Sequence, residues 1–155
     1  MSIRETSPDR PEPWPERVAV EDGCVRTSFR VRYAETDKMG VAYYANYLVW
    51  FEVLRGDFMR AINVPYTDLE ADGTFLPIAD AHVRYLAPAH YDDPVDVVGW
   101  IESVRSRAVK FGYRVEREGK VLATGSTIHV PVDADGRPRQ FSRELLTRLS
   151  VHTSK

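Results

Sequence analysis

The segment YAETDKMGVAYYANY, residues 33–47, decides the fold, because a strand pattern leads into it and a helix pattern leads out of it. Before it, the sequence alternates with a period of two, which is typical of a half-buried strand. One face of this pattern comprises Val25, Thr27, Phe29, Val31 and Tyr33. After it, large apolar residues recur at the spacing of an α-helix. They are Tyr47, Trp50, Phe51, Leu54, Phe58 and Ile62. Such strand-to-helix connections often carry functional sites.

Asp37 lies within this connection, and Asn46 stands where the helix pattern begins. Asn46 is a good N-cap residue, and Pro65 follows the end of the helix pattern. Free backbone N–H groups at a helix start carry partial positive charge, which favours an oxygen that develops negative charge. The segment therefore predicts a carboxylate beside an oxyanion-stabilising helix start.

The rest of the chain predicts one helical turn, four strands and a short final helix. The turn covers residues 66–72, with Thr67 as its cap and Gly73 after it, and Ser142 caps the final helix through Leu149. The strands are expected at residues 75–86, 94–104, 109–117 and 121–130, with a hairpin at residues 118–119 and a turn at 133–138. This order predicts an α+β fold in which an antiparallel sheet of five or six strands wraps around one long helix.

Composition excludes several classes of protein. With 155 residues and 43% hydrophobic content, residues 18–155 are expected to form one domain, behind a flexible proline-rich arm at residues 1–17 that contains Trp14. A net charge of -2 favours neither nucleic acid nor an anionic membrane as partner. Cys24 is the single cysteine, and neither a membrane span nor a signal peptide is present, so we expect a cytoplasmic protein.

Residues 31–55, VRYAETDKMGVAYYANYLVWFEVLR, resemble the hotdog-fold acyl-CoA thioesterases of the 4-hydroxybenzoyl-CoA thioesterase type. The motif of that family is Y-x-x-T-D-x-x-G-x-x-Y-[HY]-x-N-Y-x-x-x-F-E-x-x-R. The residues in register with it are Tyr33, Thr36, Asp37, Gly40, Tyr43, Tyr44, Asn46, Tyr47, Phe51, Glu52 and Arg55. Many members have histidine at the position of Tyr44, whereas the branch that acts on aromatic acyl-CoAs has tyrosine there.

The resemblance implies a hotdog fold, a homodimer or a tetramer built from two dimers, and an active site at the dimer interface. It implies that Asp37 is the catalytic carboxylate, acting either as nucleophile or as general base. On residue type alone, Asp37 also fits a turn cap before Gly40. Gly40 is expected to allow a positive φ or a close approach of the substrate. The backbone N–H of Tyr44 is the candidate donor to the thioester carbonyl oxygen.

Further candidate site residues lie on both sides of this core. Around the helix start, the candidate substrate-binding residues are Tyr43, Asn46 and Tyr47. Glu52, one turn before Arg55 on the long helix, fits either a second catalytic carboxylate or, more simply, an exposed or interface salt bridge to an arginine. A basic cluster that suits coenzyme A phosphates, or simply a solvated hairpin end, comprises Arg105, Ser106, Arg107 and Lys110.

The resulting prediction is an enzyme that hydrolyses the thioester of an acyl- or aroyl-CoA without a cofactor. The four histidines show no ligand spacing, so we expect no metal site. One alternative is a non-catalytic acyl-CoA binding module, and a second is a hotdog hydratase or dehydratase, which would need a histidine beside the acid. Acyl groups from short-chain to aromatic are all compatible with the sequence, and the thioester carrier is either coenzyme A or acyl-carrier protein.

Overall fold

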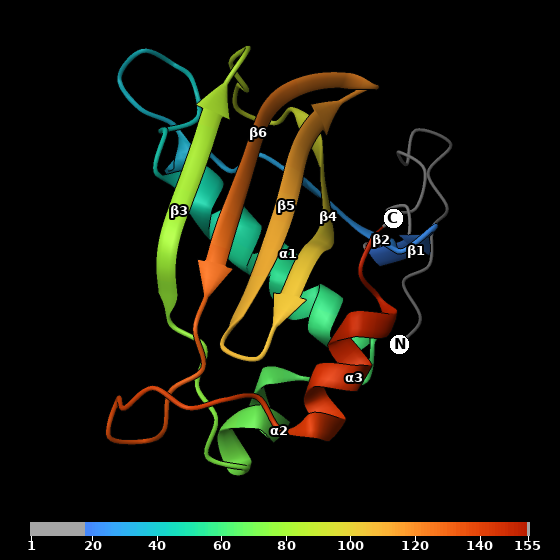
Figure 1. Ribbon diagram of the computed structural model, residues 1–155. Coiled ribbons are helices and arrows are strands. Elements are labelled where there is room, and N and C mark those ends of the chain that lie inside the picture. Colours follow the sequence, from blue (N-terminus) through green and yellow to red (C-terminus); the bar gives the residue numbers. More distant parts are fainter. Residues whose placement is uncertain (1–17, 155) are drawn as a thin grey trace, which may run out of the picture.

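The computed structural model describes residues 18–154, which form a six-stranded antiparallel sheet with one long helix along a face (Figure 1). The strands are β1 (Val18–Glu21), β2 (Cys24–Arg30), β3 (Ile78–Tyr85), β4 (Pro94–Arg105), β5 (Ala108–Arg117) and β6 (Lys120–His129). The helices are the 3-10 turn η1 (Tyr33–Glu35), α1 (Asn46–Ala61), α2 (Tyr66–Ala71) and α3 (Arg143–Val151). The strand order β1-β2-β4-β5-β6-β3 places β1 and β3 at the edges. The predicted α+β class with one antiparallel sheet is confirmed.

The start of the domain differs from the prediction in two places. β1, which the sequence analysis missed, pairs with β2 from Val18 opposite Thr27 to Glu21 opposite Cys24. The strand predicted to reach residue 33 ends at Arg30 instead. It ends there because the Glu35 carboxylate accepts the Arg32 backbone N–H at 2.8 Å, which closes the η1 turn. The predicted arm at residues 1–17 lies outside the described residues.

Two predicted helix caps are wrong, and one is confirmed. Asn46 is the first residue of α1 rather than its cap, and its side-chain N–H donates to the Glu35 carbonyl at 2.8 Å. Thr67 lies inside α2, which begins after Pro65. Ser142 does cap α3, because its Oγ accepts the Leu145 backbone N–H at 3.2 Å.

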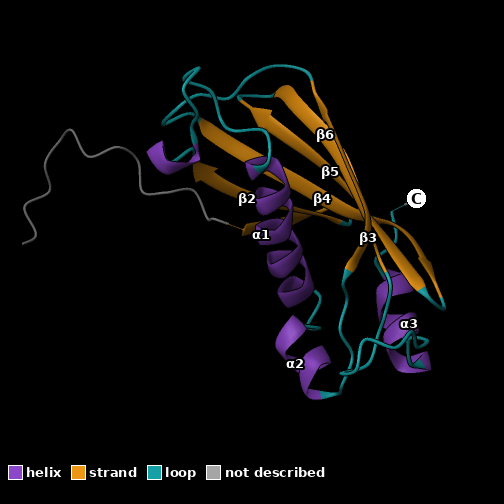
Figure 2. Cartoon of the chain, turned by 90° about the vertical axis from the view of Figure 1, so that its left-hand side faces the viewer, coloured by secondary structure: helices purple, strands orange, loops and turns teal. Residues whose placement is uncertain are grey.

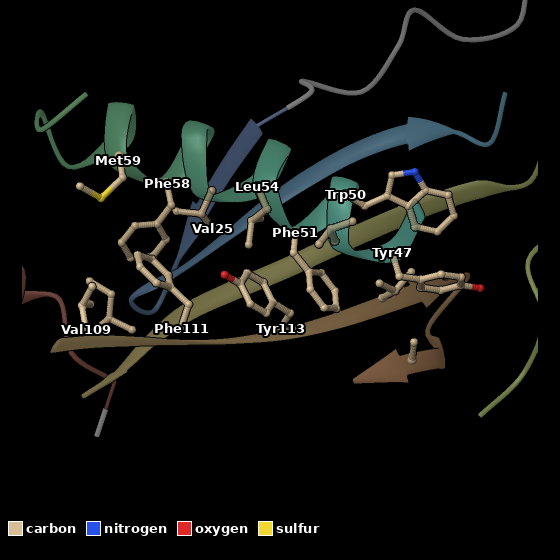
Figure 3. Close-up of a cluster of buried hydrophobic side chains, with 14 of the residues drawn as sticks. Val25, Tyr47, Trp50, Phe51, Leu54, Phe58, Met59, Val109, Phe111 and Tyr113 are labelled. Carbon is tan, nitrogen blue, oxygen red and sulfur yellow. The ribbon is translucent and has the colours of Figure 1, made fainter. Parts of the chain in front are cut away.

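The core lies between α1 and the sheet, and Figure 2 shows the helix along one sheet face. Aromatic side chains of α1 and β5 face one another there (Figure 3), with Phe51 stacked on Tyr113 at 4.2 Å between ring centroids. Gly99 lets the helix approach closely, since a Cβ on it would lie 1.8 Å from Leu54. Each large apolar side chain buried here contributes about 1.5–3 kcal/mol.

A chain of buried polar groups runs beneath α1. The Arg55 guanidinium donates to the Tyr113 hydroxyl at 3.2 Å, and this hydroxyl lies 2.6 Å from Thr127 Oγ1. Thr127 Oγ1 lies 2.8 Å from His129 Nε2, and His129 Nδ1 lies 3.1 Å from the Leu76 carbonyl. The Leu76 carbonyl can only accept, so a neutral His129 must donate to it from Nδ1. Each group in the chain then donates to the next, from Arg55 through Tyr113, Thr127 and His129 to the Leu76 carbonyl. Burial and the Arg55 charge lower the pKa of His129 to about 4.

Candidate active site

Asp37 opens a tight turn immediately after η1. Its backbone N–H donates to the Val41 carbonyl at 2.9 Å, and its carbonyl accepts the Gly40 N–H at 3.0 Å. Its Oδ1 accepts the Met39 N–H at 2.8 Å. Within residues 18–154, Oδ2 accepts no hydrogen bond, and the side chain is half-buried. Asp37 thus caps its turn with one oxygen and leaves the other available.

Gly40 closes this turn with a φ of 79°, in the left-handed region. No atom lies within 4 Å of the position that a Cβ would occupy, so space does not require the glycine. The backbone conformation does require it, because side chains other than glycine are strained at this φ.

Glu35 connects the turn to the helix, a role that the sequence analysis missed. Its side chain is only 6% exposed, and its carboxylate accepts the Trp50 indole N–H at 3.0 Å and the Arg32 guanidinium at 3.2 Å. Its carbonyl accepts the Tyr43 backbone N–H and the Asn46 side-chain N–H, both at 2.8 Å. These bonds hold the Asp37 turn against the start of α1.

The charge state of Glu35 follows from these contacts. Burial alone would raise the pKa of Glu35, but the bonds from the Arg32 N–H, the Trp50 indole and the Arg32 guanidinium outweigh it, so the pKa is lowered. A second acid two residues before Asp37 was visible in the sequence, yet nothing in its spacing distinguished a buried anchor from a solvated loop residue.

The start of α1 is left without a side-chain cap. The residue before the helix, Ala45, already has helical dihedral angles (φ -69°, ψ -23°) and cannot cap it. Within the described part of the chain, the backbone N–H of Tyr44 donates to no acceptor, while the Tyr44 carbonyl accepts the Tyr85 hydroxyl at 2.7 Å. An unbonded N–H at a helix start suits an anion or a developing oxyanion.

Two of the predicted tyrosines occupy different environments. Tyr43 is exposed, its ring lies 4.7 Å from that of Tyr44 between centroids, and its pKa is raised, first by hydrogen bonding with Tyr44. Tyr47 is buried between the rings of Trp50 and Tyr85, at 4.6 and 5.1 Å between centroids, and burial raises its pKa. The structure therefore places Tyr47 in the core, under the site rather than on it.

The predicted basic cluster lies away from Asp37 within one chain. β4 is twelve residues long; it starts at Pro94, opposite Arg30 and close to the loop, and ends at Arg105. Arg105, Ser106 and Arg107 form the exposed β4–β5 connection. Lys110 pairs with Glu102 at 3.0 Å. At about 3.3 Å per residue, the length of β4 separates this hairpin from the Asp37 turn.

Glu52 is exposed on α1, and within residues 18–154 it makes no salt bridge with Arg55, so the exposed pair on the same helix is absent and an interface pair stays a prediction. Arg55 turns inward, is only 5% exposed and bonds to Tyr113 instead. The inward position gives the guanidinium a buried hydroxyl partner, Tyr113, in place of a carboxylate on the surface.

The described residues form neither a metal site nor a membrane-spanning helix, but they do enclose a cavity. In residues 18–154, no group of histidine, cysteine and acidic side chains could hold a metal ion, and no helix is both long and apolar enough to cross a membrane. A cavity of about 550 Å³ opens between β2 and α1. Of the loop, only Arg32 and Glu35 line it, and Asp37 does not.

The curled sheet, the central helix and the carboxylate turn at the helix start define a hotdog-fold domain of the thioesterase type. The family model of the thioesterase-like superfamily matches residues 31–149, and the chain belongs to this family. The predicted family resemblance is therefore confirmed.

Individual relatives agree with this assignment. The chain is 31% identical over 123 residues to the acyl-CoA thioester hydrolase YbgC of Escherichia coli O6:H1, covering 78% of this chain and 92% of that protein. A hypothetical protein from Thermus thermophilus superposes with a TM-score of 0.80 at 38% identity, covering 85% and 99% of the two chains. A DHNA-CoA thioesterase from Staphylococcus aureus superposes with a TM-score of 0.78 at 33% identity, covering 81% of this chain and 88% of that chain.

Proposed function

We propose that this protein hydrolyses the thioester bond of an acyl- or aroyl-CoA to the free acid and coenzyme A. The observation that carries the proposal is the pairing of the Asp37 turn, in which no group of residues 18–154 bonds to Oδ2, with a start of α1 that has no side-chain cap there. Membership of the thioesterase-like superfamily and the similarity to the acyl-CoA thioester hydrolase YbgC support the same reaction class. The lone cysteine agrees with a cytoplasmic location.

In this proposal the thioester carbonyl oxygen accepts the Tyr44 backbone N–H, which stabilises the negative charge that develops on attack. Asp37 either attacks the carbonyl carbon itself, giving an anhydride that water opens, or removes a proton from the attacking water. In both routes the carbon–sulfur bond breaks, coenzyme A leaves as the thiol and the acyl group leaves as the acid. Neither route needs a cofactor.

The test is a thiol-release screen over acyl-CoAs that range from short aliphatic to aromatic, with acyl-carrier-protein thioesters beside them. We expect release with at least one class and its loss in Asp37→Asn. Tight binding of acyl-CoAs with no thiol release would favour a binding module instead. Hydration of an enoyl-CoA without thiol release would indicate a hydratase.

We also propose that the enzyme assembles through β3, as a dimer or a tetramer of two dimers. Within residues 18–154, β3 pairs only with β6, and most of its side chains are exposed, including Ile78 and Tyr85. An edge strand of eight residues readily pairs with a second copy. Because the hairpin of Arg105 and Arg107 lies at the far end of β4 from the Asp37 turn of its own chain, we propose that it serves the site of the second copy. Light scattering that shows only a 17.7 kDa species would refute it.

A further inference from the structure

The cavity between β2 and α1 contains neither of the proposed catalytic groups. β2 and α1 lie side by side (Figure 2), and residues of both line the cavity, but Asp37 and Tyr44 do not. Its volume of about 550 Å³ falls within the range of small-molecule sites. The cavity is therefore large enough for a second ligand besides the thioester substrate.

The walls of this cavity are mostly apolar. On the β2 side, the Phe29 ring is half-buried and meets the Trp50 indole edge to face, at 5.4 Å between ring centroids. On the helix side, Val53 is half-buried, and Val49, one turn earlier, remains 47% exposed. An apolar body in the cavity would remove these side chains from water, which favours binding in proportion to the area covered.

Two arginines, at the end of β2 and just after it, supply the positive charge of the cavity. The Arg30 guanidinium donates to the Asp92 carbonyl at 2.8 Å and lies 3.8 Å from the Asp92 carboxylate, which partly offsets its charge. The Arg32 side chain is 73% exposed, and within residues 18–154 its guanidinium makes one hydrogen bond, to the Glu35 carboxylate at 3.2 Å. Because a guanidinium has several N–H groups, Arg32 keeps donors for a ligand.

Glu35 is the one acid among the described lining residues, and its charge is already matched by donors. It accepts the Arg32 backbone N–H at 2.8 Å and the Trp50 indole N–H at 3.0 Å, besides the Arg32 guanidinium. Together with Arg30, the described lining residues carry two positive charges and one negative charge. This excess of positive charge favours a ligand with a single negative charge.

We propose that this cavity binds a small monocarboxylate with an apolar body, aliphatic or aromatic. The body lies against Phe29, Val49 and Val53, and the carboxylate pairs with Arg32, whose planar guanidinium matches two carboxylate oxygens. The binding itself does not depend on the proposed thioesterase activity. Free acids of this class are also what the proposed hydrolysis releases, so the ligand is either that product or another acid of the same chemistry.

The cavity wall also holds the Asp37 turn in place. Glu35 lines the cavity, and its carbonyl accepts the N–H groups of Tyr43 and Asn46 that hold this turn against α1. A bound carboxylate competes with Glu35 for the Arg32 guanidinium and so weakens the anchor of the turn. This step rests on the proposed function: at saturating acid, kcat should fall by about fivefold or more, with KM unchanged within about twofold.

The first test is calorimetric titration of the full-length chain with octanoate and with phenylbutyrate. Octanol and phenylbutanol serve as the matched uncharged ligands. We expect saturable binding of at least one acid, and binding of the corresponding alcohol that is weaker by about tenfold or more, because the alcohol lacks the charge that pairs with Arg32. Equal affinity for acid and alcohol would overturn the proposal, as would the absence of saturable binding by both acids.

Variants at two exposed valines locate the binding. Val49→Glu places a negative charge at the cavity and should weaken acid binding by about tenfold or more, whereas Val49→Lys should not weaken it. Val151→Glu makes the same change on α3, at a residue that is 74% exposed and does not line the cavity, and should leave binding unaltered. Unchanged affinity in Val49→Glu, or equal losses in Val49→Glu and Val151→Glu, would contradict the proposal.

Arg32→Gln tests the carboxylate partner directly. It keeps the backbone N–H that Glu35 accepts, so the η1 turn should survive. Acid binding should weaken by about tenfold or more, and alcohol binding should stay within about twofold, which also shows that the cavity is intact. An unchanged affinity for the acid would refute the pairing with Arg32.

Kinetics and light scattering separate this cavity from other places for the acid. Competitive inhibition that persists in Val49→Glu would place the acid beside Asp37 and overturn the proposal. A failure to bind acid, together with an assembly that Val49→Glu dissociates, would show that a second copy covers the cavity instead. Titration of the acid released from the best thioester substrate identifies the product as ligand if it binds more tightly than octanoate and phenylbutyrate. If no thioester is hydrolysed, the proposed function fails, while calorimetry still decides the cavity.

Discussion

The molecule contains the same turn twice, once beside the catalytic candidate and once far from it in the sequence. In both turns, the backbone N–H of the first aspartate, Asp37 or Asp133, donates to the carbonyl oxygen four residues later, at 2.9 Å. In both, its carboxylate accepts the N–H two residues on, at 2.8 and 2.9 Å. Gly40 and Gly136 then close the turns with φ of 79° and 77°. The turn geometry therefore does not by itself make a site.

The helix that follows each turn makes the difference. After the Asp133 turn, α3 begins at Arg143 and is capped by Ser142, whose hydroxyl accepts the Leu145 N–H. After the Asp37 turn, α1 begins without a side-chain cap, and within residues 18–154 the Tyr44 N–H has no acceptor. One turn leads to a helix start that the protein satisfies itself, and the other leads to a helix start that is open to a substrate oxygen.

The largest expected effect comes from removing the charge of each aspartate in turn. Asp37→Asn keeps an oxygen for the Met39 N–H, so the turn should survive while kcat falls by about 10²–10⁴-fold. Asp133→Asn makes the same change in the matched turn and should leave kcat unaltered. Thiol-release kinetics and thermal melts of both variants measure this. Equal loss of activity in the two variants would mean that the turns do not differ as described.

The sequence predicted these two turns unequally well. The pattern DADGRP marks residues 133–138 as a turn, and the family motif marks Asp37 as catalytic, yet neither shows that the two backbones match. The β4, β5 and β6 boundaries and the Ser142 cap were predictable, because alternation and capping are local signals. The buried positions of Glu35 and Arg55 were not, because their partners lie 15 and 58 residues away.

The second comparison concerns the buried titratable group that precedes each turn: Glu35 two residues before Asp37, and His129 four residues before Asp133. His129 has a folded pKa of about 4 against 6.5 for the free side chain, so the unfolded state binds the proton first. Stability from this group is complete above pH 6.5 and is lost as the pH falls from 6.5 to 4, by at most about 3 kcal/mol.

Glu35 acts in a lower pH range. Its folded pKa is below 4.5, so its stabilisation is present above pH 4.5 and is lost as the pH falls further. Melts at pH 7 and pH 5 should therefore show a smaller loss of Tm in His129→Gln than in the wild type, while Glu35→Gln keeps the wild-type difference. If Tm of His129→Gln falls between pH 7 and pH 5 as much as that of the wild type, then His129 is not buried in its neutral form.

A smaller effect is expected from the two turn glycines. Gly40→Ala and Gly136→Ala each force a side chain into the left-handed region, at a cost of about 1–2 kcal/mol. Both should lower Tm by similar amounts, because neither Cβ meets another atom within 4 Å. Only Gly40→Ala should also lower kcat, by about tenfold or more, since the strain moves Asp37. Activity loss in both variants would point to a general effect on folding.

The smallest effect tests the capped helix start. Ser142→Ala removes the acceptor of the Leu145 N–H and should destabilise the protein by about 1 kcal/mol, or about 2–4 °C in Tm, with kcat unchanged. Ser142→Asp retains an acceptor and should restore the Tm. Within residues 18–154, no side chain caps the start of α1, and a substrate or product analogue is expected to bind there. Ser142 lies at α3 instead, so the analogue should raise the Tm of Ser142→Ala and of the wild type by the same amount. A larger rise in Ser142→Ala would place the ligand at α3 and reverse the comparison.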